Sequence, residues 1–239
     1  MKNTIKATLV ALAVVGVASA ARATYTSGDL LVGFTLQTGN DVVFDLGTAA
    51  NLTDGETWSL NSILAPNGAN GNSFTLNDPA VKWGVIGSQN IAGHGNAWET
   101  KASGLPPVLS GNSGWSTAVN ANVTGIGGAS ATLSTAGTSG TIGSGVANSW
   151  NQQMIASTST GSYHKAFTDP DATGYTTINF YHSATDGTAA SLLGTFGFDN
   201  TGTLTFDAVS VPEPSMYGMF AAAVVLLVGL RNQFRRKQA

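Results

Sequence analysis

The chain has 239 residues, 30 glycines, no cysteine and a formal net charge of −3. Seven of its ten basic residues lie within the first 22 and the last nine residues, so residues 24–210 keep three lysines against twelve acidic residues, a formal charge of −9. This composition excludes disulfides and thiol catalysis. It also argues against nucleic-acid binding, because a body this acidic repels phosphate groups.

The N-terminus has the pattern of a secretory signal peptide. Two lysines precede an apolar stretch at 7–18, as in the charged and apolar regions of such signals. Two Ala-x-Ala sites follow this stretch. We expect signal peptidase to use the site that contains Ala21 and Ala23 and to cut after Ala23, with cleavage after Ala20 as the alternative. Residues 1–23 are therefore predicted to be a signal peptide of an exported protein.

The first structure predicted in the body is a β-hairpin. Residues 29–37 and 41–46 are rich in β-branched and aromatic side chains, and Thr38-Gly39-Asn40 separates them. A short turn sequence between two such runs is typical of a hairpin. Farther on, apolar side chains recur from Trp58 to Leu64 at helical spacing, ahead of Pro66. This pattern predicts a short helix that ends near the proline.

The rest of the body reads mainly as strands. Alternation in 175–182 places Ile178 and Phe180 on the face that should meet the core. A tight turn is expected at 199–202, from its Asp, Asn, Thr and Gly residues. The strands predicted after the first hairpin are 74–76, 81–87, 97–101, 163–167, 175–182, 192–198 and 203–206.

A Gly-, Ser- and Thr-rich stretch at 110–161 interrupts these strands. The glycines within it predict a loop. We interpret the stretch as a long insertion into one domain, with a domain boundary as the alternative. Residues 24–210 are therefore predicted to form a mainly β body, an antiparallel β-sandwich or jelly-roll-like domain with a short helical insertion. The helical part is predicted from two sets of apolar residues spaced at four: Trp115, Val119 and Val123, and Val146, Trp150 and Met154.

The body carries no motif of a nucleophilic elbow, a phosphate-binding loop or a zinc protease, and we predict no catalytic residue and no cofactor. Asp169 and Asp171 open a stretch that resembles a calcium loop, but Phe180 stands where the closing glutamate belongs. A plain Asx turn explains these two residues equally well. Asp41 and Asp45 share one face of a predicted strand, at a spacing that is not diagnostic of a glycosidase.

We also consider the tryptophans and histidines as sugar-binding and metal-binding residues. The five tryptophans could stack on sugar rings if two were exposed on one face, and otherwise they fill the core. The three histidines lack a second ligand at metal-binding spacing, so we predict no metal site for them.

The last 29 residues consist of three successive pieces. A stiff segment comes first, since each proline disfavours helix at the residue before it. The apolar run 216–230 would span about 22 Å as a helix, against a bilayer core of about 30 Å. The basic end, 231–239, should stay on the cytoplasmic side. The stiff segment is Val211, Pro212, Glu213, Pro214 and Ser215, and the cations are Arg231, Arg235, Arg236 and Lys237.

The order of these pieces resembles the PEP-CTERM sorting signal of Gram-negative bacteria. Pro212-Glu213-Pro214 matches the Pro-Glu-Pro box, 216–230 the transmembrane helix and Arg235-Arg236-Lys237 the basic end, over about an eighth of the chain. The resemblance implies an inner-membrane precursor that an exosortase, a membrane-embedded cysteine transpeptidase, cuts near the box. It also implies a final location at the cell surface or outside the cell, and association with exopolysaccharide and biofilm. An ordinary C-terminal membrane anchor is the alternative.

Three classes of function follow for the body. The first is a non-enzymatic structural or exopolysaccharide-associated protein of the surface or extracellular matrix. The second is a carbohydrate-binding, lectin-like module, with calcium at Asp169 and Asp171. The third is a secreted hydrolase. Exposed paired tryptophans in a groove would favour the second class, and two convergent carboxylates roughly 5–9 Å apart in a cleft would favour the third.

Overall fold

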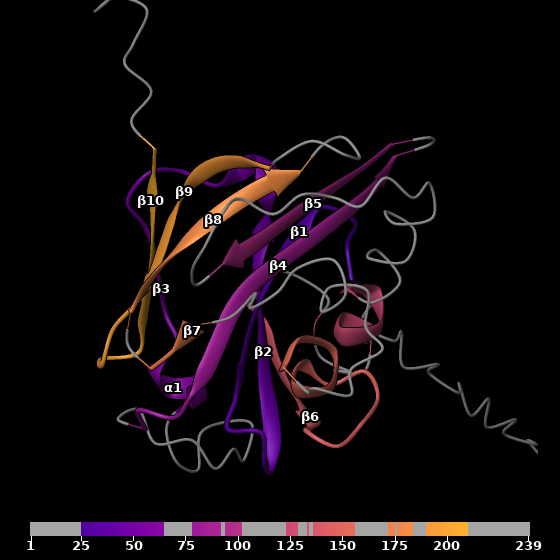
Figure 1. The fold of residues 1–239 in the computed structure, drawn as a ribbon, viewed down its shortest axis with the longest axis vertical. Helices are drawn as coiled ribbons and strands as arrows, with labels where there is room; N and C mark the ends of the chain where they lie inside the picture. The colour runs from indigo at the N-terminus through magenta and orange to yellow at the C-terminus, as the bar shows by residue number, and fades with distance from the viewer. Residues whose placement is uncertain are drawn as a thin grey trace, which may run out of the picture.

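The computed structural model describes residues 25–64, 78–91, 94–101, 123–128, 133, 136–155, 172–174, 176–183 and 190–209. Its strands are β1 (Asp29–Thr35), β2 (Asn40–Thr48), β3 (Glu56–Ser59), β4 (Lys82–Ile91), β5 (His94–Lys101), β6 (Ser139–Gly143), β7 (Ala172–Thr173), β8 (Thr177–Ser183), β9 (Ser191–Phe198) and β10 (Thr203–Ala208) (Figure 1). Its helical elements are the 3₁₀ turn η1 (Ala49–Asn51), the one-turn helix α1 (Asn61–Leu64) and the π-helical turn η2 (Asn151–Ile155). Residues 123–128 are also helical.

All of these strands hydrogen-bond into one antiparallel sheet. The order is β3-β10-β9-β8-β5-β4-β1-β2-β6, with β7 paired to β4. The sheet curls, so that strands far apart in this order meet (Figure 1). The ring centroids of Phe34 on β1 and Phe198 on β9 lie 5.0 Å apart, although three strands separate β1 from β9. The mainly β, antiparallel body is confirmed, but the strands expected in the two layers of a sandwich belong to one continuous sheet.

Two irregularities in strand pairing contribute to the curl. The register shifts between Leu30 and Leu31 where β1 pairs with β2, and between Phe180 and Tyr181 where β8 pairs with β9. A bulge leaves one extra residue in a strand, which bends the strand and increases its twist. Added to the ordinary right-handed twist of a sheet, these bulges help its two halves to face each other.

The inner face of the curled sheet encloses the larger apolar cluster, which we call the inner core. Successive side chains of a strand point to opposite faces, and alternate residues therefore supply this core. Phe180 packs edge-on against Phe196 with centroids 4.9 Å apart, and Phe196 lies 5.1 Å from Phe206. Ile178 and Phe180 are buried here, as the alternation in their strand predicts.

The outer face of β1, β2, β4 and β5 carries a second apolar cluster, which we call the outer core. Val123, Ile126 and Leu133 are buried in it, together with Trp150 and Met154. The prediction that Trp150 and Met154 share a buried face is therefore confirmed. Val146 is 51% exposed, which contradicts its predicted place on that face. The reason is local, because turns occupy the residues before Trp150 and a π-helical turn follows it.

Two further expectations for local structure fail. The helix expected from Trp58 to Leu64 is limited to α1, because Glu56–Ser59 instead pairs with β10 as strand β3. Trp58 on β3 packs near Phe196, with ring centroids 6.1 Å apart. The loop expected within the Gly/Ser/Thr-rich insertion contains a strand, β6, which pairs with β2. In both places an available sheet edge overrides the local propensity.

The tight turn expected at 199–202 is present between β9 and β10. The Asp199 Oδ1 atom accepts hydrogen bonds from the backbone N–H groups of Thr201 and Thr203, both at 2.9 Å, and from the Thr201 hydroxyl at 2.7 Å. Desolvation acts to raise the pKa of Asp199, but these hydrogen bonds together outweigh it and lower the pKa. The predicted β1–β2 hairpin is confirmed as well, with Gly39 at a φ of 75° in its turn.

We expect Asp199→Ala to lower the free energy of unfolding by about 1 kcal/mol, because the turn loses its shared acceptor. Urea unfolding at neutral pH measures this change. Asp207→Ala, an exposed acid on β10, is the matched control and should leave the stability within about 0.5 kcal/mol. An Asp199 variant as stable as its control would contradict the role of the carboxylate in the turn.

Several predictions lie outside the described residues. They are the strands at 74–76 and 163–167, the signal-peptide residues Ala21 and Ala23, the weak calcium candidates Asp169 and Asp171, and the tail from Val211 to Ala239. Within the described ranges, no helix combines the length and the apolar character needed to cross a membrane.

Candidate functional site

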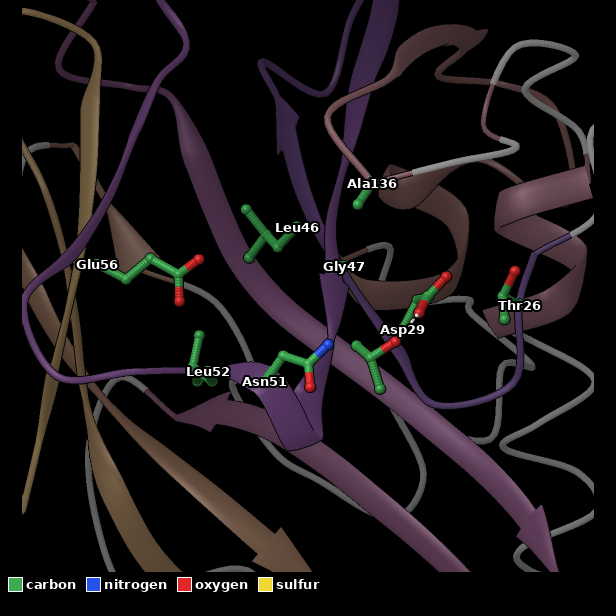
Figure 2. Close-up of a pocket in the computed structure, with 9 residues that line it drawn as sticks. Thr26, Asp29, Leu46, Gly47, Asn51, Leu52, Glu56 and Ala136 are labelled. Atoms are coloured by element: carbon green, nitrogen blue, oxygen red, sulfur yellow. Dashed lines mark hydrogen bonds between the residues drawn. The ribbon is translucent and has the colours of Figure 1, made fainter.

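A pocket of about 390 Å³ opens where the end of β2 and η1 approach β3. Pockets that bind small molecules have volumes of about 300–1,000 Å³. Asp29 and Glu56 lie on opposite sides of the pocket (Figure 2). We call it the Asp29 pocket, and its lining residues are Thr26, Asp29, Leu46, Gly47, Thr48, Asn51, Leu52, Glu56 and Ala136.

The start of β1 is held by Tyr25 and Gly28, which fixes the position of Asp29. The Tyr25 hydroxyl lies 2.8 Å from the carbonyl oxygens of both Asp29 and Ser88, and burial raises its pKa to about 12. Gly28 has a φ of 100°, which a residue with a side chain rarely adopts. Its N–H donates to the Ser88 carbonyl at 2.9 Å, and its own carbonyl accepts from the N–H of Ala49 at 2.9 Å.

The bulge between β1 and β2 forms the adjoining wall. Leu30 pairs with Gly47 and Leu31 with Asp45, so Leu46 is the extra residue. Leu46 is buried in the inner core and also lines the pocket. Gly47 has a φ of 92°, and a β-carbon there would lie 3.1 Å from the β-carbon of Ala136. The bulge therefore brings the backbone of β2 close to the chain around Ala136.

Asp29 is the most buried carboxylate in the pocket lining, at 5% exposed. Its Oδ1 atom accepts a hydrogen bond of 2.8 Å from the Thr48 hydroxyl. Its Oδ2 atom accepts none within the part of the chain that the structure describes. Glu56 is half-buried, and its Oε2 atom accepts from the Thr53 N–H at 3.1 Å. Each carboxylate is thus held in place and keeps an oxygen available for a ligand.

Asp45 lies next to the pocket, behind the bulge. It is almost fully buried, and its Oδ1 atom accepts a 2.8 Å hydrogen bond from the Gly47 N–H. Burial raises the pKa of Asp45 to about 6, and the negative charge of Asp29 adds to the increase. The pKa of Asp45 therefore depends on the charge of Asp29.

The other acid predicted on this face, Asp41, has a structural position. It is 0% exposed, and its Oδ2 atom accepts a 2.6 Å hydrogen bond from the N–H of Asn151, the first residue of η2. Burial raises its pKa. Asp41 and Asp45 do lie on one face of a strand, as predicted, but Asp41 anchors the outer core and does not line the Asp29 pocket.

Glu99 is a buried acid that sequence reasoning missed. It is 2% exposed, and neither of its carboxylate oxygens has a hydrogen-bond partner among the residues that the structure describes. Burial raises its pKa well above the usual value, while the charge of Lys101 lowers it. The only sequence signal of its burial is that it lies two residues after Ala97, on the same face of the strand, and Ala97 belongs to the outer core.

The tryptophans in the described residues do not form an exposed pair. Trp83 and Trp150 are buried, and Trp58 and Trp98 are partly buried against the inner core. Trp115 lies outside the described residues. The core alternative for Trp83 and Trp150 is therefore confirmed.

His182 packs within the protein in a similar way. Its ring stacks on that of Trp98 with centroids 5.2 Å apart, and its Nε2 atom lies 3.1 Å from Oδ1 of Asn96. Burial lowers its pKa. In the parts of the chain that the structure describes, no three His, Asp or Glu side chains are placed to hold a metal ion together.

A second, shallower depression of about 510 Å³ crosses β8, β9 and β10. Threonine hydroxyls dominate it, and its carboxylate, Asp199, is already the acceptor for its own turn. The Asp29 pocket is the more enclosed of the two and contains two carboxylates that each keep an oxygen available, and we take it as the candidate site. Comparison of the chain with protein-family models, with curated proteins and with solved structures found no match.

Proposed function

We propose that this chain is an exported, non-enzymatic protein of the cell surface or extracellular matrix, with a structural or exopolysaccharide-associated role. A signal peptide at 1–23 would direct export, and the tail at 211–239 would pass the precursor to an exosortase. The observation that supports this proposal is the order of the tail: a rigid Pro212-Glu213-Pro214 box, an apolar run and a basic end.

Each piece of the tail has a physical role in this proposal. The prolines keep the box extended, as a processing enzyme requires of its substrate. The apolar run is about 8 Å shorter than a bilayer core when helical, and Arg231 can extend toward the membrane surface to compensate. The cluster at Arg235, Arg236 and Lys237 would hold the C-terminus on the cytoplasmic side until the chain is cut.

We expect replacement of Pro212, Glu213 and Pro214 by alanine to leave an unprocessed, membrane-held precursor in the native host. Immunoblotting of membrane and medium fractions, with mass spectrometry of the mature C-terminus, measures this outcome. Replacing Pro106 and Pro107 by alanine, a proline pair in the body, is the matched control and should not change processing. Normal processing of the box variant would contradict the proposal.

A second candidate function, carbohydrate binding, is favoured by the Asp29 pocket. The lining combines carboxylate, amide and hydroxyl groups with the apolar side chains of Leu46 and Leu52. Small-ligand sites pair an apolar surface with a few placed polar groups in this way. The body would then attach to a polysaccharide through one sugar unit, which is compatible with a role at the surface or in the matrix.

A further inference from the structure

We infer that the Asp29 pocket recognises an amino sugar through its protonated amine, and discriminates against the neutral, N-acetylated form of the same sugar. The inference rests on the carbohydrate-binding function proposed above and names its ligand class. The observations that support it are the charge of the pocket, the available oxygen of Asp29 and the apolar side chains beside it.

Among the residues that the structure describes, the lining of the pocket is negative and carries no positive side chain. Asp29 and Glu56 contribute carboxylates from opposite sides (Figure 2). None of the nine described lining residues is Lys, Arg or His. Lys82 pairs with Thr35 at the far end of β1 from Asp29, which over seven residues corresponds to roughly 20 Å. An anionic sugar would meet uncompensated repulsion in this pocket, whereas a cationic group would be attracted.

The Asp29 carboxylate is prepared to accept a hydrogen bond from a cation. The side chain is 5% exposed, its Oδ1 atom is held by Thr48, and its Oδ2 atom accepts no hydrogen bond from a described residue. An ammonium group that donates to Oδ2 would form a charge-assisted hydrogen bond, which is about twice as strong as a neutral one. An N-acetyl group carries no charge and one N–H donor, and would therefore satisfy this carboxylate less well.

The remaining lining residues suit the rest of a sugar ring. Asn51 and the hydroxyl of Thr26 are exposed beside the carboxylates and can bond sugar hydroxyls. Leu46 and Leu52 offer apolar area for the C–H groups of a pyranose. A volume of about 390 Å³ is near the lower end of small-ligand sites, so one sugar unit is the expected occupant.

The experiment is isothermal titration calorimetry at about pH 6 with the full chain in a mild detergent, so that it does not depend on processing of the tail. The probes are a glucosamine dimer, its N-acetylated counterpart and calcium chloride. We expect the glucosamine dimer to bind at least about tenfold more tightly than the N-acetylated dimer. Asp29→Asn should remove this preference, since asparagine keeps an oxygen for the Thr48 hydroxyl but not the charge.

Two further variants keep the test decisive. Glu56→Gln changes the half-exposed carboxylate on the opposite side and should also weaken glucosamine binding, even if Asp29→Asn folds poorly. Asp207→Asn removes one negative charge from an exposed site on β10 and should leave binding unchanged. An equal loss in Asp207→Asn would show that overall charge, and not the pocket, attracts the amine, and would overturn the inference.

The outcomes separate this inference from the proposed functions. Equal or tighter binding of the N-acetylated dimer, lost in Asp29→Asn, would overturn amine recognition and leave carbohydrate binding in place. Binding of calcium alone, lost in Asp29→Asn, would replace the amino sugar by a divalent cation. No binding of either sugar would overturn both the inference and carbohydrate binding, whereas the sorting proposal depends only on the processing experiment.

Discussion

We expect Gly33→Ala to lower the free energy of unfolding by about 3 kcal/mol, because the added methyl group has no space in the folded chain. A β-carbon on Gly33 would overlap the indole ring of Trp150, which is 1% exposed in the outer core. The strand cannot yield, because Gly33 pairs with Val43 on one side and with Gly84 on the other. The indole would have to move, and the π-helical turn that begins at Asn151 would move with it.

Urea unfolding followed by tryptophan fluorescence measures this effect. Gly145→Ala is the matched control, because a β-carbon there meets nothing within 4 Å and its φ lies outside the left-handed region. The control should change stability by less than about 0.5 kcal/mol. A Gly33 variant that unfolds like the control would mean that Trp150 does not pack on β1 in solution.

The second large effect is an increase in stability as the pH falls from about 7.5 to 5. Asp41, Asp45 and Glu99 are buried on the outer face of the sheet, and burial raises all three pKa values. No salt bridge is formed by these carboxylates within the described ranges. The folded state therefore favours their protonated forms, and ionisation at higher pH opposes folding.

The direction of this pH dependence follows from proton linkage. The pKa of Asp45 is 3.8 when unperturbed and about 6 when folded, so the folded state binds more protons between these values. The stabilising contribution is complete below about pH 4 and is lost as the pH rises through 6, a change of at most about 3 kcal/mol. His182 acts in the opposite direction, since its lowered pKa reduces stability as the pH falls below its unperturbed value of 6.5.

Urea unfolding of the parent chain and of Asp45→Asn at several pH values tests this expectation. The variant cannot ionise at this position, and its stability should depend less on pH between 5 and 7.5. His182→Gln is the companion variant, in which the increase toward acid pH should be larger than in the parent. A parent chain that loses stability steadily from pH 7.5 to 5 would contradict the expectation.

Several strands could be predicted because their information is local. Turn residues at Thr38-Gly39-Asn40 lie between two β-rich runs, and the β1–β2 hairpin forms there. Alternation in β8 identified Ile178 and Phe180 as core residues. These signals depend on neighbours within a few residues, so the sequence pattern contains them directly.

The secondary-structure predictions were wrong where pairing with a strand distant in sequence determines the local structure. Trp58 has helical spacing to its apolar neighbours, yet β10 recruits it into a strand. The residues of β6, Ser-Gly-Thr-Ile-Gly, have no strand-like pattern of their own and pair with β2. Glu99 was not singled out from the sequence, and only the tertiary structure shows that the face on which it lies is buried. Local propensity is weaker than a full set of backbone hydrogen bonds to a sheet edge.

The amino-acid sequence alone was enough to predict a mainly β, antiparallel body, because periodicity and turn chemistry operate over short stretches of chain. The signal peptide and the sorting tail also come from sequence, and they stay predictions. Only the tertiary structure decided that all the described strands share one curled sheet, and that Asp29 and Glu56 line one pocket. Those arrangements depend on bulges, strand order and curl. These features bring together residues that are far apart along the chain, and no local sequence pattern indicates such contacts.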